Sequence, residues 1–491
     1  MQTRSFLLAL GLSLLLALPA ESLPVAPRIL VIDDDDDDDE DDGRKEDVLP
    51  GEGPALGSRI TQEDIESGRL SLRRLRREGM RIFSTPFNAL DGYGDGPMNV
   101  LDPTSPGGRP TLGDNGTFLR VNGLDSQACL ECHSVLSART VPARFAVGGA
   151  GGISAVALPG PTEVDIDDET GLGFAFFNGR MINPPFVFGA GGVELVAKEM
   201  TIELQQLKRR ARRNPGDVVE LVAKGVSFGS ISYDEGTATF DTKAVEGVDD
   251  DLVVRPFGRK GNNSSVRAFD IGALQFHQGM QPVEVVGEGV DADGDGVVNE
   301  ILAGELSALH VFSVLTERPR MVKTSDRRRR DRGFEMFEEI GCDECHVPML
   351  TTRSDELPLA FPEVETNPYE NVYMHVRLRG GSAGFERASG GGIEVPMFSD
   401  LKRHHMGDDL QESTGDELDG HFITPRLWGV ADSAPYMHDG RALSLRDAIG
   451  MHAGEGQAAA ADFAALSTRQ QQDLLFFLNA LRTPHEPNRK L

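Results

Sequence analysis

The chain contains very little cysteine, with four residues in 491, and only one tryptophan. A chain of 491 residues is long enough for two or three domains with sizeable cores. A formal net charge of −29 excludes nucleic acid as an expected partner, because a phosphate backbone repels so acidic a chain. Beyond the N-terminus no apolar run reaches the roughly 20 residues of a membrane-spanning helix, so we predict no transmembrane segment.

All four cysteines fall in two copies of one short motif. The copies are Cys129-Leu130-Glu131-Cys132-His133 and Cys342-Asp343-Glu344-Cys345-His346. C-x-x-C-H is the attachment signature of c-type haem, in which two thiolates bind the porphyrin and the histidine ligates iron. A metal or disulfide site is the alternative for a single copy. Two copies that use every cysteine favour two covalently bound haem c groups.

The N-terminus indicates export. Residues 1–22 combine a basic start at Arg4, an apolar stretch from Phe6 to Leu18 and small residues at Ala20 and Ser22. This pattern is typical of a secretory signal peptide and is too short for a membrane span. Covalent haem attachment takes place outside the cytoplasm, so the motifs and the signal peptide together predict a periplasmic protein.

An acidic tract follows the signal peptide. Residues 33–42 are all Asp apart from Glu40, and such a run repels itself and buries no apolar area. We therefore expect residues 23–58 to form a disordered tether, with calcium binding as the less favoured alternative. The remaining acidity would attract a basic electron-donor protein.

The two haem motifs lie in two related units. Each follows a segment with helical periodicity, starting at Gly79 in the first unit and at Gly333 in the second. A capping box at Ser467 and apolar residues from Leu474 to Leu481 predict a C-terminal helix that packs back onto the second haem-binding helix.

We expect a mainly α fold made of two cytochrome c-like haem domains. The first covers residues 59–320 and the second residues 321–491. Alternating apolar and polar residues predict a small β insertion at about 217–254.

Three segments of the second unit resemble a known family. They are Thr424-Pro425-Arg426-Leu427-Trp428-Gly429, Ala434-Pro435-Tyr436-Met437-His438-Asp439-Gly440 and Ser444-Leu445-Arg446-Asp447-Ala448-Ile449-Gly450-Met451-His452. The chain resembles bacterial di-haem cytochrome c peroxidases and their MauG relatives, and most of all the thiol-oxidoreductase-like di-haem oxidoreductase branch. The resemblance implies a peroxidase-like oxidoreductase in which an electron-transfer haem feeds a catalytic haem.

The resemblance also implies a sixth ligand for the second haem. In these peroxidases the ligand follows the Tyr/Phe-His-Asp-Gly motif, and the corresponding position here is His452. The peroxidases usually carry methionine there, so His452 would give a bis-histidine haem of low potential. Met451, His404 and Met406 stay open as alternatives. The single tryptophan, Trp428, fits core packing as well as a place beside the haem.

The first haem departs from the family pattern, because no histidine occurs between His133 and His277. Two arrangements remain open. In one, His277 is the distal ligand or an acid/base group. In the other the site is open, and a buried carboxylate such as Glu194 moves the proton between the peroxide oxygens.

A further motif has the spacing of a cation-binding loop. Within residues 291–300, Asp291, Asp293 and Asp295 occupy loop positions 1, 3 and 5, with glycine at position 6. Position 12 would be Leu302, which cannot supply a carboxylate, so Glu300 or a residue from elsewhere would have to complete the shell. The related peroxidases hold calcium between their haem domains, and a plain acidic turn is the alternative.

Two functions therefore remain open from the sequence. The first is a periplasmic di-haem peroxidase that takes electrons from a small cytochrome or cupredoxin and acts on hydrogen peroxide or another oxidisable substrate. The second is a non-enzymatic electron carrier in which both haems are six-coordinate. The sequence leaves open whether the chain forms a homodimer.

Overall fold

The computed structural model describes residues 52–94, 96, 98, 127–135, 183–412 and 417–485, together with five short strands between residues 111 and 177. The predicted signal peptide and most of the predicted acidic tether lie outside the described residues. The description below concerns the compact unit Leu49–Leu491. None of the helices in the described part of the chain is long and apolar enough to cross a membrane.

The described α-helices range from one turn to seven turns. They are α1 (Gln62–Glu66), α2 (Leu72–Ser84), α3 (Cys129–Cys132), α4 (Ala190–Arg213), α5 (Val266–Ala273), α6 (Val283–Val286), α7 (Ala303–Val314), α8 (Arg327–Glu339), α9 (Leu445–Gly450), α10 (Gln457–Ala465) and α11 (Thr468–Leu478). The irregular helices are the π-helix η1 (Leu274–Gln278) and the 3₁₀ turns η2 (Cys342–Glu344), η3 (Asp408–Leu410), η4 (Val430–Asp432) and η5 (Gly454–Gly456).

The strands are short and form several small antiparallel sheets. The sheets are β1 (Thr111–Leu112), β2 (Thr117–Arg120) and β3 (Gly123–Leu124); β4 (Ile166–Asp167) and β5 (Phe176–Phe177); β6 (Val219–Ala223), β7 (Val226–Asp234) and β8 (Thr239–Asp241); β9 (Arg320–Met321) and β17 (Leu481–Arg482); β10 (Leu350–Thr351), β14 (Ile393–Val395) and β13 (Glu386–Arg387); β11 (Glu356–Ala360) and β12 (Val372–Arg377); and β15 (Arg403–His405) and β16 (His421–Ile423).

The expectation of a mainly α fold made of two cytochrome c-like domains is wrong. Of the described residues, 36% are helical and 16% lie in strands, and the strands are spread over several small sheets. Many of these strands have only two or three residues, which is too short for an apolar–polar alternation to show in the sequence. Helical periodicity is therefore the stronger signal in the sequence. A prediction based on it overstates the helical content and misses the small sheets.

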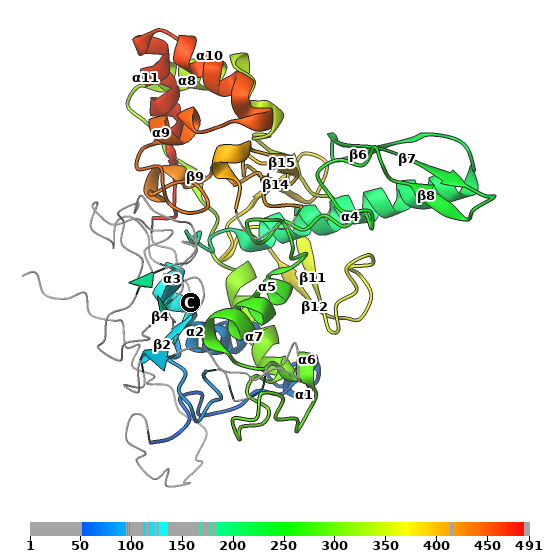
Figure 1. The fold of residues 1–491 in the computed structure, drawn as a ribbon, viewed down its shortest axis with the longest axis vertical. Coiled ribbons are helices and arrows are strands. Elements are labelled where there is room, and N and C mark those ends of the chain that lie inside the picture. Colours follow the sequence, from blue (N-terminus) through cyan, green and yellow to red (C-terminus); the bar gives the residue numbers. More distant parts are fainter. Residues whose placement is uncertain are drawn as a thin grey trace, which may run out of the picture. The chain divides into compact units, whose positions relative to one another are not determined.

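One pair of helices, α2 and α7, packs closely within the first predicted unit, residues 59–320 (Figure 1). The pair meets where Gly79 has no side chain, and a Cβ atom at this position would clash with the backbone at Ala308 and with Phe312. Beside this contact the rings of Phe83 and Phe312 lie 5.4 Å apart. The glycine therefore sets how closely the two helices approach, and the aromatic pair fills the space next to it.

A second pair, α8 and α11, repeats this arrangement in the C-terminal half (Figure 1). A Cβ atom on Gly333 would clash with the backbone at Asp473 and with Phe477, and the rings of Phe337 and Phe477 lie 5.5 Å apart. The predicted return of a C-terminal helix onto the helix before the second haem motif is confirmed. In both pairs the glycine precedes its aromatic partner by one helical turn, so the two halves share this packing unit.

The long helix α4 connects the region after the first motif to the sheet β6–β8 (Figure 1). Its N-terminal half is buried nearly all round, and its C-terminal half carries the basic residues Arg210, Arg212 and Arg213. Strand β6 alternates buried and exposed residues, with its buried face toward the core. This sheet lies inside the segment 217–254, where alternation predicted strands.

The last residues of the predicted tether pack against the folded chain. Leu56 is buried, and the backbone N–H groups of Ala55 and Leu56 donate hydrogen bonds to the carboxylate of Asp91 at 2.9 and 3.0 Å. Residues 55–56 are therefore fixed to the loop after α2.

Candidate functional site

The two histidines predicted for the second haem face each other. His346 follows η2, His452 follows α9, and their ring centroids lie 6.3 Å apart. A metal ion between two imidazoles needs about 2 Å for each metal–nitrogen bond, which with the ring radii places the centroids about 6 Å apart. The spacing of the pair therefore fits one iron bound on both sides. Burial, together with the neighbouring His452, lowers the pKa of His346 to about 4, and burial also lowers the pKa of His452.

The three histidines predicted as iron ligands share one hydrogen-bond pattern, in which Nδ1 donates to a backbone carbonyl. The bonds run from His133 to Pro185 (2.7 Å), from His346 to Phe398 (3.1 Å) and from His452 to Ala448 (2.8 Å). Because a carbonyl oxygen can only accept, the proton is on Nδ1 and the lone pair is on Nε2. A carbonyl that fixes the tautomer and the ring orientation in this way is usual for histidines that bind metals.

His404, an alternative ligand for the second haem, has a different environment. Its Nε2 lies 2.8 Å from the carboxylate of Asp400 and its Nδ1 lies 2.7 Å from the carboxylate of Glu455. Burial lowers the pKa of His404, but Asp400, Cys345 and Glu455 outweigh it and raise the value to about 11. Neither ring nitrogen has a lone pair available to a metal while these two bonds are made.

The first motif forms the short helix α3 and is covered by residues of α5 and η1. The side-chain amide of Gln278 lies 3.9 Å from the sulfur of Cys129, and the ring of Phe269 stands edge-on to His133 with centroids 6.2 Å apart. Burial and the nearby Asp270 raise the pKa of the Cys129 thiol to about 12. The covering residues therefore include a polar amide and an aromatic ring that cannot ligate iron.

Asp270 is a half-buried acid in this region. Its Oδ2 is buried with no hydrogen-bond partner, and burial together with the charge of Glu194 raises its pKa well above the usual range. Burial of a carboxyl group without a compensating partner disfavours its charged form. No motif in the sequence singles out Asp270, because its position near Cys129 depends on which helix covers the first motif.

His277 lies on the π-helix η1, directly before Gln278. The ring is half-buried and packs edge-on against Phe276 with centroids 4.9 Å apart. Single π-helical turns often occur at functional sites, because the extra residue redirects side chains. The structure thus brings His277 into the segment that covers the first motif, and its role as ligand or acid/base group stays a prediction.

Glu194 is fully buried and has several hydrogen-bond partners. Its carboxylate accepts a hydrogen bond from the backbone N–H of Val266 at 2.9 Å, lies 3.0 Å from His310 Nε2 and lies 2.7 Å from the Lys198 ammonium. Burial raises its pKa, but His310 and Lys198 outweigh burial and bring it to about 2. Glu194 therefore holds a charge that fixes the first turn of α5, which presents Phe269 to the first motif.

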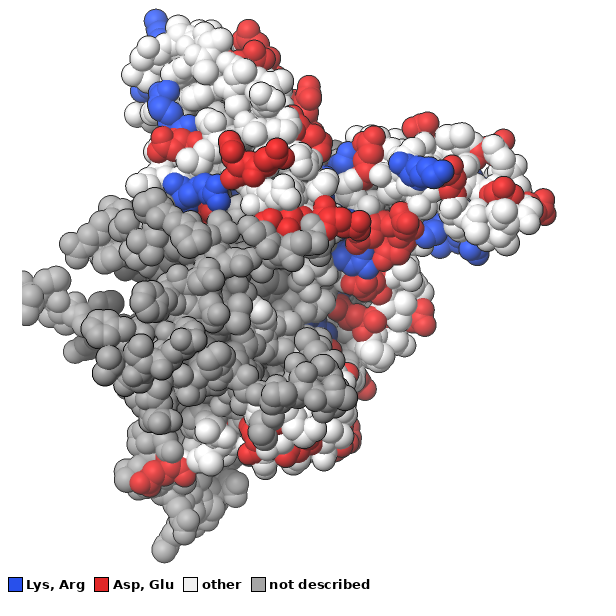
Figure 2. Space-filling model, viewed as in Figure 1, with Lys and Arg blue, Asp and Glu red and all other residues white. Residues whose placement is uncertain are grey.

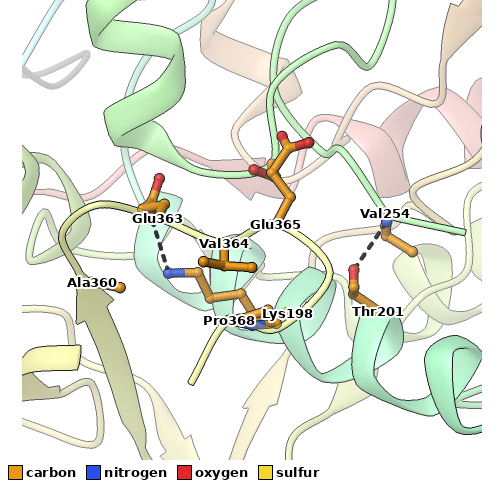
Figure 3. A pocket seen from close by; sticks show the side chains of 9 residues that line it. Lys198, Thr201, Val254, Ala360, Glu363, Val364, Glu365 and Pro368 are labelled. Carbon is orange, nitrogen blue, oxygen red and sulfur yellow. Dashed lines mark hydrogen bonds and ion pairs between the residues drawn. The ribbon is translucent and has the colours of Figure 1, made fainter. Parts of the chain in front are cut away.

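Glu194, His310 and Glu363 place three ligand atoms within 4.8 Å of one another. The Lys198 ammonium already lies among them, at 2.7 Å from Glu194 and 3.4 Å from Glu363. Figure 3 shows Lys198 pointing toward Glu363 across a cavity of about 10 Å³. That volume is at the lower limit for a single water molecule.

The acidic loop brings its carboxylates together. One oxygen each from Asp291, Asp293 and Asp295 lies within 4.8 Å of the others. Glu300 is buried beside them, and its carboxylate accepts a hydrogen bond from the backbone N–H of Gln281 at 2.6 Å. Burial and the three aspartate charges raise the pKa of Glu300 to about 9. A bound dication would offset this mutual repulsion.

The loops that follow the two haem motifs pack against each other. A Cβ atom on Gly189 would lie 2.8 Å from the ring of Trp428, and Asn183 donates hydrogen bonds to the carbonyls of Pro435 (2.7 Å) and Met437 (3.1 Å). Trp428 is buried, and its Nε1 has no hydrogen-bond partner. Pro185, whose carbonyl accepts the hydrogen bond from His133, lies in the same loop as Asn183. The orientation of the His133 ring therefore depends on the packing of this loop against the C-terminal part of the chain.

A family model described as "Di-haem oxidoreductase, putative peroxidase" matches residues 216–481, which is more than half of the chain and includes the second motif. A comparison with curated proteins finds no match. Among solved structures, hydrazine synthase from Kuenenia stuttgartiensis is 19% identical, with 52% of this chain and 78% of that chain covered and a TM-score of 0.27. A MauG-like protein associated with microbial copper homeostasis is 19% identical, with 46% and 68% covered and a TM-score of 0.24. Neither TM-score is high enough to support a conclusion about this chain.

Proposed function

Because the chain belongs to the di-haem oxidoreductase family, we propose that it is a peroxidase-like enzyme with two covalently bound haem c groups. The proposed haem-binding residues are Cys129, Cys132 and His133 for the first group and Cys342, Cys345, His346 and His452 for the second. When bound, the second haem passes single electrons and the first reduces peroxide or oxidises another substrate. All four thiols are free of disulfide bonds, as this chemistry requires.

The observation that carries this proposal is the second imidazole at the second motif, because the ring centroids of His346 and His452 lie 6.3 Å apart. A pair of imidazoles favours a closed iron that only transfers electrons. Both proximal histidines also contact a phenyl ring, Phe269 at 6.2 Å from His133 and Phe337 at 6.5 Å from His346, so these rings do not distinguish the two sites. For the first haem we propose an open site that binds the substrate.

The proposed groups for proton transfer at the first haem lie on α5 and η1. His277 is the proposed acid/base residue, because it precedes Gln278, whose amide lies 3.9 Å from the Cys129 sulfur. Glu194 supports this arrangement through its bond to the N-terminus of α5, 2.9 Å from Val266 N. We propose Glu194 as a positioning residue, since its partners keep its pKa at about 2.

We further propose that the loop 291–300 binds calcium through Asp291, Asp293 and Asp295. Three carboxylate oxygens within 4.8 Å are hard ligands of the type that Ca²⁺ prefers. Glu300, with its pKa raised to about 9, is the fourth oxygen donor and would lose its proton when the cation binds.

The proposed setting is the periplasm, after export by the signal peptide at residues 1–22. The proposed electron donor is a small basic cytochrome or cupredoxin. Figure 2 shows acidic side chains gathered over the part of the described surface near α4, with basic side chains between them. Beside α4, where Gln205 donates a hydrogen bond to the carbonyl of Asp251 at 2.6 Å, Asp249, Asp251 and Glu365 surround Arg255 at 2.5–3.0 Å. A mainly acidic surface would steer a basic donor.

A second function is supported by one observation. His277 lies on the π-helix that covers the first motif, so a sixth ligand for the first haem is within the same short segment as Gln278. If His277 binds iron firmly, the chain is a di-haem electron carrier in which both haems are closed.

The proposal is tested by removing one haem at a time from the exported protein. Cys129→Ala/Cys132→Ala is expected to leave one haem and to abolish the reduction of hydrogen peroxide by a reduced cytochrome. Cys342→Ala/Cys345→Ala is expected to leave one haem that still binds peroxide but receives electrons poorly. A wild-type protein with two haems and no reaction with peroxide in either redox state would contradict the enzyme function.

A further inference from the structure

We propose that His404 is an imidazolium whose charge sets the reduction potential of the second haem. This inference rests on the proposed function, because it takes Cys345 as a haem attachment point and His346 with His452 as the axial pair. In this proposal His404 is not an iron ligand. It changes the reduction potential of the second haem from outside the ligand shell of the iron.

The charge on His404 follows from its hydrogen bonds. Nε2 faces Asp400 Oδ2 at 2.8 Å, and Nδ1 faces Glu455 Oε2 at 2.7 Å. Ionised carboxylates only accept hydrogen bonds, so both ring nitrogens must carry protons. The ring is therefore an imidazolium held between two carboxylates, and these two contacts are charge-assisted.

His404 also lies next to the second haem motif. Its Nδ1 is 4.0 Å from the sulfur of Cys345, which is the atom that would be bonded to the porphyrin. Asp400 is fixed to the same motif, because its backbone N–H donates a hydrogen bond to the carbonyl of Cys345 at 2.9 Å. The charges of His404 and Asp400 are both buried, at 8% and 2% exposure, so water screens them little.

The side chains of Asp400, His404 and Glu455 carry one positive and two negative charges. Ferric haem has one positive charge more than ferrous haem, so a negative neighbour favours the oxidised iron and lowers its reduction potential. Removal of the imidazolium leaves two negative charges beside the haem, whereas removal of the Glu455 charge leaves none in net. The two substitutions therefore shift the potential in opposite directions.

Two variants of the haem-loaded protein test this by spectroelectrochemical titration of the second haem. His404→Gln is expected to lower its potential, with a tenfold or larger fall in the equilibrium constant for reduction by a fixed donor. Glu455→Gln is expected to raise the potential. His404→Lys, which restores a positive charge, is expected to return the potential toward the wild-type value.

His405→Gln is the matched control, because His405 is the next residue on β15 and its ring packs against His421, with centroids 5.1 Å apart. It is expected to leave the potential unchanged. A merely structural role for His404 would lower haem content or stability without shifts of opposite sign.

The outcomes separate the inference from the function on which it rests. Potentials that stay unchanged in His404→Gln and Glu455→Gln, with intact low-spin spectra, overturn the inference alone. A wild-type second haem that lacks a bis-histidine spectrum overturns the proposed function. If His404→Gln fails to fold, Glu455→Gln decides the matter, because Glu455 has a half-exposed side chain (54%) and its removal spares the ring. No rise in potential in that variant would overturn the inference.

Discussion

His346 and His452 face each other at 6.3 Å between ring centroids, although they belong to different elements. Each ring donates from Nδ1 to a backbone carbonyl, of Phe398 in one case and of Ala448 in the other. Both lone pairs on Nε2 are thereby available for one metal ion. The pairing depends on tertiary structure, because the two rings meet only when η2, α9 and the segment before β15 are all in place.

His452→Ala is expected to convert the second haem from a six-coordinate low-spin state to one with an open site. The physical reason is the loss of one of the two imidazoles, whose ring centroids lie 6.3 Å apart. Absorbance and electron paramagnetic resonance spectra of the oxidised protein measure the change. Met451→Leu is the control, because Met451 is the alternative ligand. A low-spin signal that survives in His452→Ala and disappears in Met451→Leu would reverse the assignment.

Gly333→Ala is expected to destabilise the chain by about 1–3 kcal/mol, since the new Cβ atom overpacks the contact between α8 and α11. Denaturant unfolding measures the loss. Gly272→Ala, in α5, has no atom within 4 Å of the added Cβ atom and should be neutral or slightly stabilising. Equal effects of the two substitutions would argue against a close helix contact at Gly333.

Glu194→Gln is expected to reduce the free energy of unfolding by about 3 kcal/mol or more, because it removes one charge from a buried ion pair with Lys198. The exposed Glu235 offers a matched control in Glu235→Gln, for which we expect little change. A similar stability in the two variants would mean that Glu194 does not anchor α5.

The pH dependence of stability follows from the same residue. The pKa of Glu194 is about 2 in the folded chain, against an ordinary value of 4.5. Between these values the unfolded chain binds more protons, so stability is lost as the pH falls through this window. Thermal unfolding between pH 2 and 5 should show a shallower dependence in Glu194→Gln than in the wild type.

Removal of calcium is expected to lower the melting temperature, because the loop 291–300 would then hold unneutralised carboxylates. Chelation followed by calorimetry, with and without added Ca²⁺, measures the shift. Asp293→Asn should lose most of the response to calcium, since Asp293 is the most buried of the three aspartates. A melting temperature that changes neither on chelation nor in Asp293→Asn would indicate a plain acidic turn.

The sequence predicted features that depend on short local patterns. It placed the two CxxCH motifs, the cation-loop spacing, and the C-terminal helix that returns to α8. It predicted His452 as a ligand by resemblance, and that residue lies opposite His346. It overestimated the helical character, because two-residue strands such as β10 and β13 carry no periodicity.

The sequence could not predict what long-range packing decides. The cover of the first motif by Phe269 and Gln278 depends on the position of α5, which Glu194 fixes from another helix. The carboxylates around His404 come from positions on either side of it in the chain, Asp400 and Glu455. Asp400 is 4 residues from His404, but Glu455 is 51 residues away, so only the folded chain brings all three together.

In the proposed function one haem is closed and the other reacts with peroxide. Electron paramagnetic resonance of the oxidised and half-reduced protein, before and after addition of hydrogen peroxide, distinguishes the two haems. We predict one low-spin bis-histidine signal that peroxide leaves in place and a second haem whose signal changes when peroxide is added. Two low-spin signals in both redox states, with no response to peroxide, would contradict the claim and favour an electron carrier.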